Sequence, residues 1–236
     1  AAGAVCGMAE TAVPETEDKP LIVASMFGNT TQAVNTAKAV LEAAGYEVLV
    51  FHCTGNGGRT MESLIKDGRV AGVFDITTTE LADELVGGVL TAGPTRLDAA
   101  AKTGTPAIVV PGCVDMVNFW APETIPGQFA GRTFYEHNPN VTLMRTDVEE
   151  SRRLGAIMAE KLNESTGPVT VLLPLRGVSM IDAPDGAFWW PEANQALFDT
   201  LKQSLRDDIP VIEMDCNVNA PEFATRCAEV LLEEMA

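Results

Sequence analysis

The sequence has few basic residues. Lysine and arginine together number 16, against 33 aspartate and glutamate residues, which gives a formal net charge of −17. A surface of this sign repels the nucleic-acid backbone and anionic lipid headgroups, so we expect neither nucleic acid nor a membrane surface as a partner. An anionic ligand would need a local, shielded site, and a helix N-terminus can supply one through its free backbone N–H groups.

Paired cysteines and long apolar runs are also lacking. The five cysteines include no C-x-x-C pair, which argues against a disulfide framework or a structural zinc site and favours a reducing setting. No unbroken apolar stretch is long enough to span a bilayer, and the N-terminus lacks the basic and apolar segments of a signal peptide. We therefore expect a cytoplasmic protein without a metal site.

Apolar runs of strand length alternate with helical patterns along most of the chain. The expected strands cover 20–26, 46–52, 70–76, 106–112, 141–146, 167–175 and 209–215. Strands separated by helices form right-handed crossovers, which place the strands in a mostly parallel sheet with helices on both faces. The sequence therefore predicts an α/β fold with a three-layer, Rossmann-like arrangement. Residues 113–140 and 176–191 fit neither pattern and are expected to be long irregular loops.

Residues 20–236 show no internal repeat, no low-complexity tract and no second linker, and we expect them to form one domain. Residues 1–19 differ. The stretch "AAGAVCGMAE" resembles the end of a helix rich in small residues, and "TAVPETEDKP" resembles a polar linker that contains proline. We expect residues 1–19 to be the tail of a preceding N-terminal domain, which would be a partner of this one.

Polar and glycine residues follow the predicted strands, at the end of the sheet where ligands bind in open parallel structures. Their clustering predicts a single binding site beyond the carboxyl ends of the strands. The candidate binding residues are Asn29, Thr30, Thr31, Thr54, Gly55, Gly57, Gly58, Arg59, Thr78, Thr79, Glu80 and Arg176.

The segment "HCTGNGGRTME", residues 52–62, is the most specific part of this pattern. Gly55, Gly57 and Gly58 let backbone N–H groups approach a ligand without a Cβ in the way, and the following helix start adds partial positive charge. The spacing matches neither a P-loop nor the G-x-G-x-x-G fingerprint. The segment indicates either a phosphate-binding loop or a tight turn that requires glycine. Residues 27–31, "FGNTT", indicate either a smaller anion loop or an ordinary helix cap.

His52 and His137 are the only histidines, and each is a candidate general base or a structural group. Asp75, at the end of the third strand, is a further catalytic candidate, and Arg176 would anchor a carboxylate or phosphate. A metal site made by His52, Asp75 and Asp115 is conceivable but lacks local ligand spacing.

Two further pairs of residues are candidates for a function: two cysteines that each follow a predicted strand, and two tryptophans in a predicted loop. Cys53 and Cys113 could act as opposed proton-transfer groups, although free cysteine is more often a small buried apolar residue. Trp189 and Trp190 could stack on a base, cover a partner surface, or pack their own loop onto the body of the domain.

Six long segments together resemble one protein family. They are "MFGNTT", "GYEVLVFHCTGNGGRTMESLI", "DITTTELADELVGGVLTAGPTRLDAA", "VPGCVDMVNFW", "HNPNVTLMRT" and "LPLRGVSMIDAPDG". With them, nearly all of 20–236 is similar to the UPF0261 family, the Tm-1-like proteins. This resemblance implies two α/β domains in tandem, of which this chain would be the C-terminal one. It also implies binding of ATP or a related nucleotide, with Mg²⁺ as its companion ion.

Three hypotheses of function follow, in order of preference. The first is a domain that binds a nucleotide or another small molecule carrying phosphate. The second is an enzyme of hydrolase or isomerase type that uses His52 or His137 as its base. The third is a structural module that forms a homo-oligomer and lays "PDGAFWW" on its partner.

Overall fold

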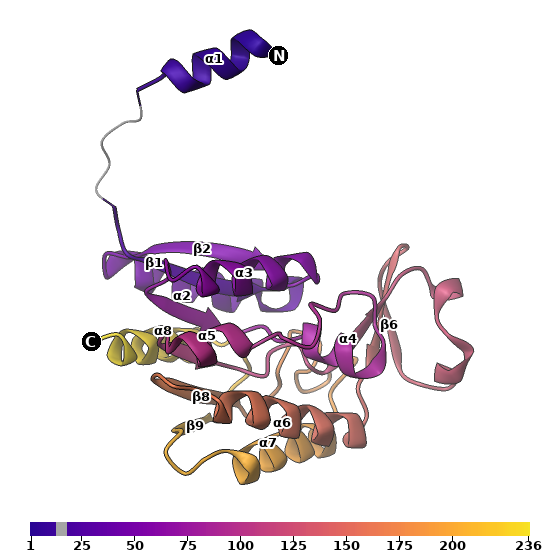
Figure 1. Ribbon diagram of the computed structural model, residues 1–236. Coiled ribbons are helices and arrows are strands. Elements are labelled where there is room, and N and C mark those ends of the chain that lie inside the picture. Colours follow the sequence, from indigo (N-terminus) through magenta and orange to yellow (C-terminus); the bar gives the residue numbers. More distant parts are fainter. Residues whose placement is uncertain (13–17) are drawn as a thin grey trace.

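The computed structural model describes residues 1–12 and 18–236 (Figure 1). Helix α1 (Ala2–Glu10) covers the segment that resembles a helix end, and it buries none of its residues. Of the predicted linker, residues 13–17 lie outside the described part of the chain. No helix in the described part combines the length and the apolar character needed to cross a membrane.

Six parallel strands form the central sheet. In spatial order they are β2 (Glu47–His52), β1 (Leu21–Met26), β3 (Gly72–Asp75), β4 (Ala107–Val109), β8 (Val169–Pro174) and β9 (Val211–Met214). Every neighbouring pair is parallel, which confirms the predicted α/β architecture. The strand order reverses between β1 and β3, and open sheets of this kind bind ligands beyond the carboxyl ends of the strands near such a reversal.

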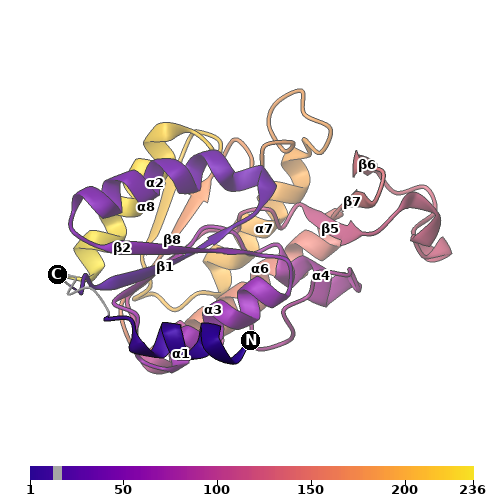
Figure 2. The same cartoon turned by 90° about the horizontal axis from the view of Figure 1, so that it is seen from above.

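Helices cover both faces of this sheet (Figure 2). On one face lie α2 (Thr31–Ala43) and α8 (Pro221–Glu234); on the other lie α3 (Asn56–Lys66), α5 (Asp98–Thr103), α6 (Val148–Asn163) and α7 (Pro191–Ser204). Successive residues of a strand serve opposite faces. Val23 belongs to the core with α3 and α6, whereas Ile22 and Ala24 belong to the core with α2 and α8. Because both faces are covered, the strands are apolar almost throughout.

A smaller, antiparallel sheet of three strands lies beyond the carboxyl ends of β1 and β2 (Figures 1 and 2). Its strands, in spatial order, are β5 (Met116–Phe119), β7 (Val141–Arg145) and β6 (Phe134–Asn138). The strand β7 was predicted, but β5 and β6 lie in the segment 113–140 that was predicted to be irregular. That prediction was wrong because β5 is very short and β6 is exposed along most of its length, so neither shows an apolar period.

Short helical segments fill the remaining connections. They are η1 (Gly28–Thr30), α4 (Glu80–Val86), η2 (Pro122–Thr124) and η3 (Gly127–Phe129). The start of α6 is fixed by a capping box: the Glu150 N–H donates to Asp147 Oδ1, and the Asp147 N–H donates to Glu150 Oε2, both at 2.8 Å.

Candidate functional site

A cavity of about 400 Å³ opens between the carboxyl end of the parallel sheet and the small antiparallel sheet. Its lining residues are Phe27, Gly28, Asn29, His52, Thr54, Leu90, Trp120, His137, Asn138, Val141 and Leu143. One wall comes from the segments that end or follow β1 and β2, and another from β6, β7 and the residue after β5. We call this space the histidine cavity, because both histidines of the chain line it.

Four predicted site residues meet in this cavity. His52 is the last residue of β2, and the centre of its exposed ring lies 5.5 Å from that of Phe27. His137 reaches the same space from β6. Asn29 and Thr54 add an amide and a hydroxyl group to the lining. Imidazoles can donate, accept and exchange protons, so this arrangement can bind a polar group and can also support acid–base chemistry.

Aromatic and aliphatic side chains supply most of the remaining lining. Trp120 follows β5 directly, and its side chain is 51% exposed. Leu90 comes from the loop after α4, and Val141 and Leu143 come from β7. An exposed indole beside aliphatic groups is suited to the flat face of a ligand ring.

In the glycine loop, by contrast, two of the amides are already bound within the protein. The N–H groups of Gly55 and Gly58 both donate to Glu80 Oε1, at 2.8 and 3.1 Å. Glu80 is fully buried at the start of α4. A carboxylate of the protein itself therefore occupies the place at the N-terminus of α3 that was predicted for a phosphate. This corrects the prediction that Gly55, Gly58 and Glu80 bind a ligand.

Packing explains why this turn contains glycine. Gly55 has a φ of +85°, a left-handed conformation that favours glycine. A Cβ on Gly57 would overlap the carbonyl oxygen of His52, and a Cβ on Gly58 would overlap the carboxylate of Glu80. The geometry thus supports the tight-turn interpretation of the segment, and Gly57 is also not among the residues that line the cavity.

Arg96 gathers the buried carboxylates under the ends of the strands. Its Nη1 and Nη2 donate to the two oxygens of Asp75, at 2.5 and 2.7 Å, and its Nε donates to Glu80 at 2.8 Å. All three side chains are buried. Burial alone would lower the pKa of Arg96, but the Asp75 and Glu80 carboxylates raise it well above its usual value. Asp75 is therefore a buried ion-pair partner of Arg96 and lies outside the lining of the histidine cavity. Its catalytic role stays a prediction from the sequence.

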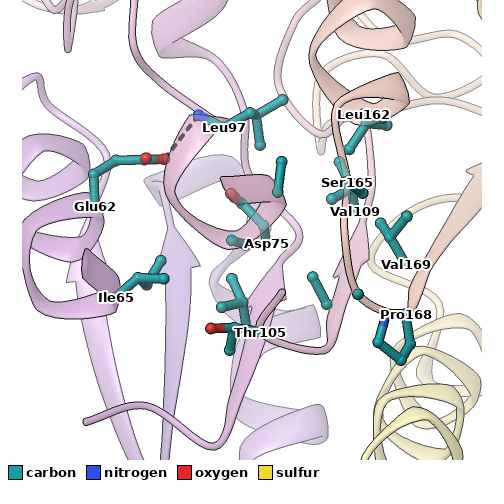
Figure 3. Close-up of a pocket in the computed structure, with 15 residues that line it drawn as sticks. Glu62, Ile65, Asp75, Leu97, Thr105, Val109, Leu162, Ser165, Pro168 and Val169 are labelled. Atoms are coloured by element: carbon teal, nitrogen blue, oxygen red, sulfur yellow. Dashed lines mark hydrogen bonds between the residues drawn. The ribbon is translucent and has the colours of Figure 1, made fainter. Parts of the chain in front are cut away.

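Glu62 extends this buried cluster to α5. Its carboxylate accepts the Leu97 N–H at 2.7 Å, at the start of that helix (Figure 3). It also accepts the Ala99 N–H at 2.8 Å, and burial raises the pKa of Glu62. The hollow drawn in Figure 3 beside Glu62 has a volume of about 10 Å³. It has room for about one water molecule, so it is not a ligand site.

The segment "FGNTT" is a helix cap. Thr30 Oγ1 accepts the Phe27 N–H at 3.1 Å, and Thr31 Oγ1 donates to the Phe27 carbonyl at 3.2 Å. Thr30 is fully buried, and its hydroxyl also lies 2.7 Å from Thr77 Oγ1. Both hydroxyls therefore bond to the local backbone, and neither residue lines the cavity, so ligand binding by Thr30 and Thr31 stays a prediction from the sequence.

The other predicted binding residues also lie outside the cavity lining. Thr78 and Thr79 are fully buried. Arg59 is exposed and donates to a backbone carbonyl and to a neighbouring asparagine. Arg176 is exposed and lies 3.8 Å from Asp215. These four residues are therefore not assembled into one site, because each is held by its own local partners or packing.

Cys53 and Cys113 are both fully buried. Burial raises the pKa of each thiol, so both stay protonated. A protonated thiol enclosed by protein cannot exchange protons with a substrate, which excludes the opposed-cysteine interpretation.

Asp115 belongs to a second buried group, apart from His52 and Asp75. Ser179 Oγ donates to Asp115 Oδ2 at 2.8 Å and accepts the Asp182 N–H at 3.0 Å. The other oxygen, Oδ1, has no hydrogen-bond partner among the described residues. Burial, together with the nearby Asp182 carboxylate, raises the pKa of Asp115 to about 7. The three residues of the conceivable metal site thus lie in three different environments.

Comparison with known proteins decides the family. The model described as "Uncharacterised protein family (UPF0261) C-terminal domain" matches residues 19–235. The chain belongs to the UPF0261 family. This UPF0261 domain is 51% identical over 237 residues to a UPF0261 protein of Clostridium tetani, with 100% of the chain and 59% of the relative covered. It is 43% identical over 236 residues to the ToMV resistance protein Tm-1 of Solanum lycopersicum, with 98% and 31% covered.

The UPF0261 domain spans less than two thirds of the length of these relatives. A solved structure of a thioesterase domain from the curacin biosynthetic pathway is 12% identical, with 92% of each chain covered and a TM-score of 0.43. A likeness at this level carries no argument about function. The family match confirms the resemblance found in the sequence, and the cavity geometry is what bears on function.

Sequence reasoning missed much of the lining of this UPF0261 domain. The missed residues are Phe27, Gly28, Leu90, Trp120, Asn138, Val141 and Leu143. Trp120 fell in a segment predicted to be irregular, because the strand before it, 116–119, is only four residues long and is interrupted by Asn118. Most of the missed residues come from the small sheet or from loops, and no local pattern in the sequence places these beside the parallel strands.

Proposed function

We propose that this domain binds a small organic molecule with a planar ring in the histidine cavity. The observation that carries the proposal is the convergence of both histidines, two aromatic side chains and several neutral polar groups on one cavity of about 400 Å³. Cavities of about 300–1,000 Å³ with largely apolar walls and a few polar groups are typical of small-molecule sites. A nucleotide-type ligand, which the family resemblance implies, belongs to this class.

Each kind of side chain in the lining suits a different part of the ligand. Trp120 and Phe27 offer ring faces for stacking, which contributes about 1–3 kcal/mol per base in nucleic-acid complexes. His52, Asn29 and His137 offer donors and acceptors for the polar groups of the ligand. The site also lies where open parallel sheets bind ligands, beyond the carboxyl ends of the strands.

A ligand screen on the purified domain tests this proposal. Nucleosides and a set of small heterocyclic compounds would be screened by ligand-observed NMR, and the hits would be titrated by calorimetry. We expect Trp120→Ala to weaken binding of a hit by at least about tenfold, because a stacking contact of about 1.4 kcal/mol is lost. His52→Ala should weaken it as well.

The matched control is Trp190→Ala. Trp190 is also exposed, at 36%, but it lies at the start of α7 and does not line the cavity. Its replacement should leave the affinity unchanged. Equal affinities for wild type and Trp120→Ala across all hits would contradict the proposal.

A second candidate function is acid–base catalysis on the bound molecule. The observation that favours it is that the two histidines line the same cavity, so one can accept a proton while the other donates one. The reaction would be of hydrolase or isomerase type. Hits from the screen would be incubated with the domain and followed by NMR. His52→Gln or His137→Gln should lower turnover by about 10²–10⁴, and turnover that both variants retain would exclude this function.

A further inference from the structure

We infer that the histidine cavity selects ligands of low charge: a ring compound that is neutral or carries a single negative charge, and not Mg²⁺-bound ATP. This inference rests on the proposed function and adds the chemical class of the ligand. It departs from what the family resemblance implies, because the residues present do not fit a triphosphate.

The lining itself is the first reason. Its side chains are aromatic, aliphatic, amide, hydroxyl or imidazole groups, and none of the described residues that line it is Lys, Arg, Asp or Glu. The residues outside the described part, 13–17, also contain neither lysine nor arginine. Proteins hold triphosphates with arginine or lysine side chains and with carboxylates that bind Mg²⁺. This cavity offers a polyanion only neutral donors and two imidazoles.

Three arginines that are near these segments in the sequence are already engaged. Arg59 Nη1 donates to the Thr91 carbonyl at 3.0 Å, and its Nη2 donates to Asn56 at 2.7 Å. Arg96 is buried among carboxylates, and Arg145 is buried with its Nε donating to the Phe188 carbonyl at 2.7 Å. Recruiting Arg59 to a phosphate would break its local hydrogen bonds, and recruiting Arg96 or Arg145 would break buried contacts of the fold.

The helix N-terminus beside the cavity is also filled. In many α/β proteins the start of a helix after a glycine-rich turn receives phosphate oxygens. Here the start of α3 receives Oε1 of the buried Glu80, which Arg96 holds from its other oxygen at 2.8 Å. An incoming phosphate would meet a carboxylate in this place, within a domain of net charge −17. Both effects oppose a ligand with several negative charges.

The experiment compares series of probes that share a ring system and differ in the number of phosphate groups, and hence in charge. Adenosine, AMP and ATP, uridine, UMP and UTP, and 1-naphthol with 1-naphthyl phosphate would be titrated with Mg²⁺ present, at constant ionic strength. We expect affinity to fall along each series, with the triphosphate bound at least about tenfold more weakly than the uncharged member. Trp120→Ala identifies which of the bound probes occupy the cavity.

A variant that adds a positive charge to the cavity tests the inference even if the wild-type protein binds the probes weakly. Leu90 lines the cavity and is half-buried, so Leu90→Lys adds a cation to the lining, and Leu90→Met is the matched neutral control. Leu90→Lys should raise the affinity for AMP or ATP by at least about tenfold, while Leu90→Met should not. Triphosphates bound by wild type as tightly as their nucleosides, in a manner sensitive to Trp120→Ala, would overturn the charge selection and leave the proposed function intact. No cavity binding by any probe, to wild type or to Leu90→Lys, would overturn both.

Discussion

At the scale of single residues, Glu80 connects two parts of the structure that are distant in sequence. One carboxylate oxygen accepts two N–H groups at the start of α3, and the other accepts Nε of Arg96. Three elements, α3, α4 and the segment before α5, therefore meet at one buried carboxylate. A buried ion pair is costly to break, since removing one partner leaves the other charge without compensation.

We predict that Glu80→Ala destabilises the domain by about 3–5 kcal/mol, because Arg96 loses a partner and two buried N–H groups lose their acceptor. Urea denaturation followed by circular dichroism measures the change. Glu160→Ala is the control, since Glu160 is an exposed glutamate on α6. Equal unfolding midpoints for the two variants would show that the Glu80 cluster does not stabilise the fold.

A second residue-scale prediction concerns Asp115, whose pKa is raised to about 7 by burial and by Asp182. In the unfolded state the pKa of an aspartate is about 3.9. Between pH values equal to these two pKa values, the folded state therefore holds a proton that the unfolded state has lost. This contribution to stability is complete below about pH 4 and is lost as the pH rises to about 7. Asp115→Asn removes it.

Relative to wild type, Asp115→Asn should therefore gain stability as the pH rises from about 5 to about 7, by at most about 1.4 kcal/mol per pH unit. Thermal unfolding of both proteins across this range provides the measurement. Asp67→Asn, at an exposed aspartate, should show no such trend. A difference between wild type and Asp115→Asn that stays constant with pH would refute the raised pKa.

The residues of the candidate site could be predicted only in part from the sequence. His52, Thr54 and Asn29 were found because they follow strands, and strand ends are visible as the ends of apolar runs. Glu80 was misassigned because a buried carboxylate and a surface carboxylate look alike in a sequence. Its partners lie 22 and 25 residues away, and only the fold brings them together.

At the scale of elements, the start of α6 is fixed by a local pattern: Asp147 and Glu150, three residues apart, form the capping box. We predict that Asp147→Ala costs about 1 kcal/mol of stability, because one helix-end N–H loses its acceptor. Asp147→Ser keeps a side-chain acceptor and should cost only a fraction of this. Urea denaturation of both variants measures the loss of stability. Equal losses for Asp147→Ala and Asp147→Ser would show that the side-chain acceptor of the cap does not stabilise the helix.

The parallel strands were predictable for a physical reason that the small sheet does not share. A strand buried on both faces is apolar along most of its length, so β1 and β8 appear as largely apolar runs, interrupted only by Ser25 and Thr170. The strand β6 is exposed, so its sequence is not constrained in this way. It is held by pairing with β7, and the sequence of a strand does not show which other strand it pairs with.

At the scale of the whole molecule, the excess of acidic residues acts on every charged group. The net charge of −17 opposes compactness through mutual repulsion, and salt shortens the range of that repulsion. Raising NaCl from about 0.01 M to about 0.1 M reduces the screening length from about 30 Å to about 10 Å. We predict that the midpoint of thermal unfolding rises over this range, and equally in KCl. A midpoint that falls with salt would show that attractive surface pairs outweigh the repulsion.

The histidine cavity has one wall on the parallel sheet and another on the segment from 116 to 145. The ion cluster around Arg96 lies entirely outside the segment 116–145, because Arg96 and its partners Glu62, Asp75 and Glu80 all precede that segment in the chain. The buried cluster that stabilises the fold thus lies outside the stretch 116–145, which supplies one of the two walls of the cavity. Exchanging residues 116–145 between relatives therefore offers a direct route to altered ligand preference, while the cluster around Arg96 is retained.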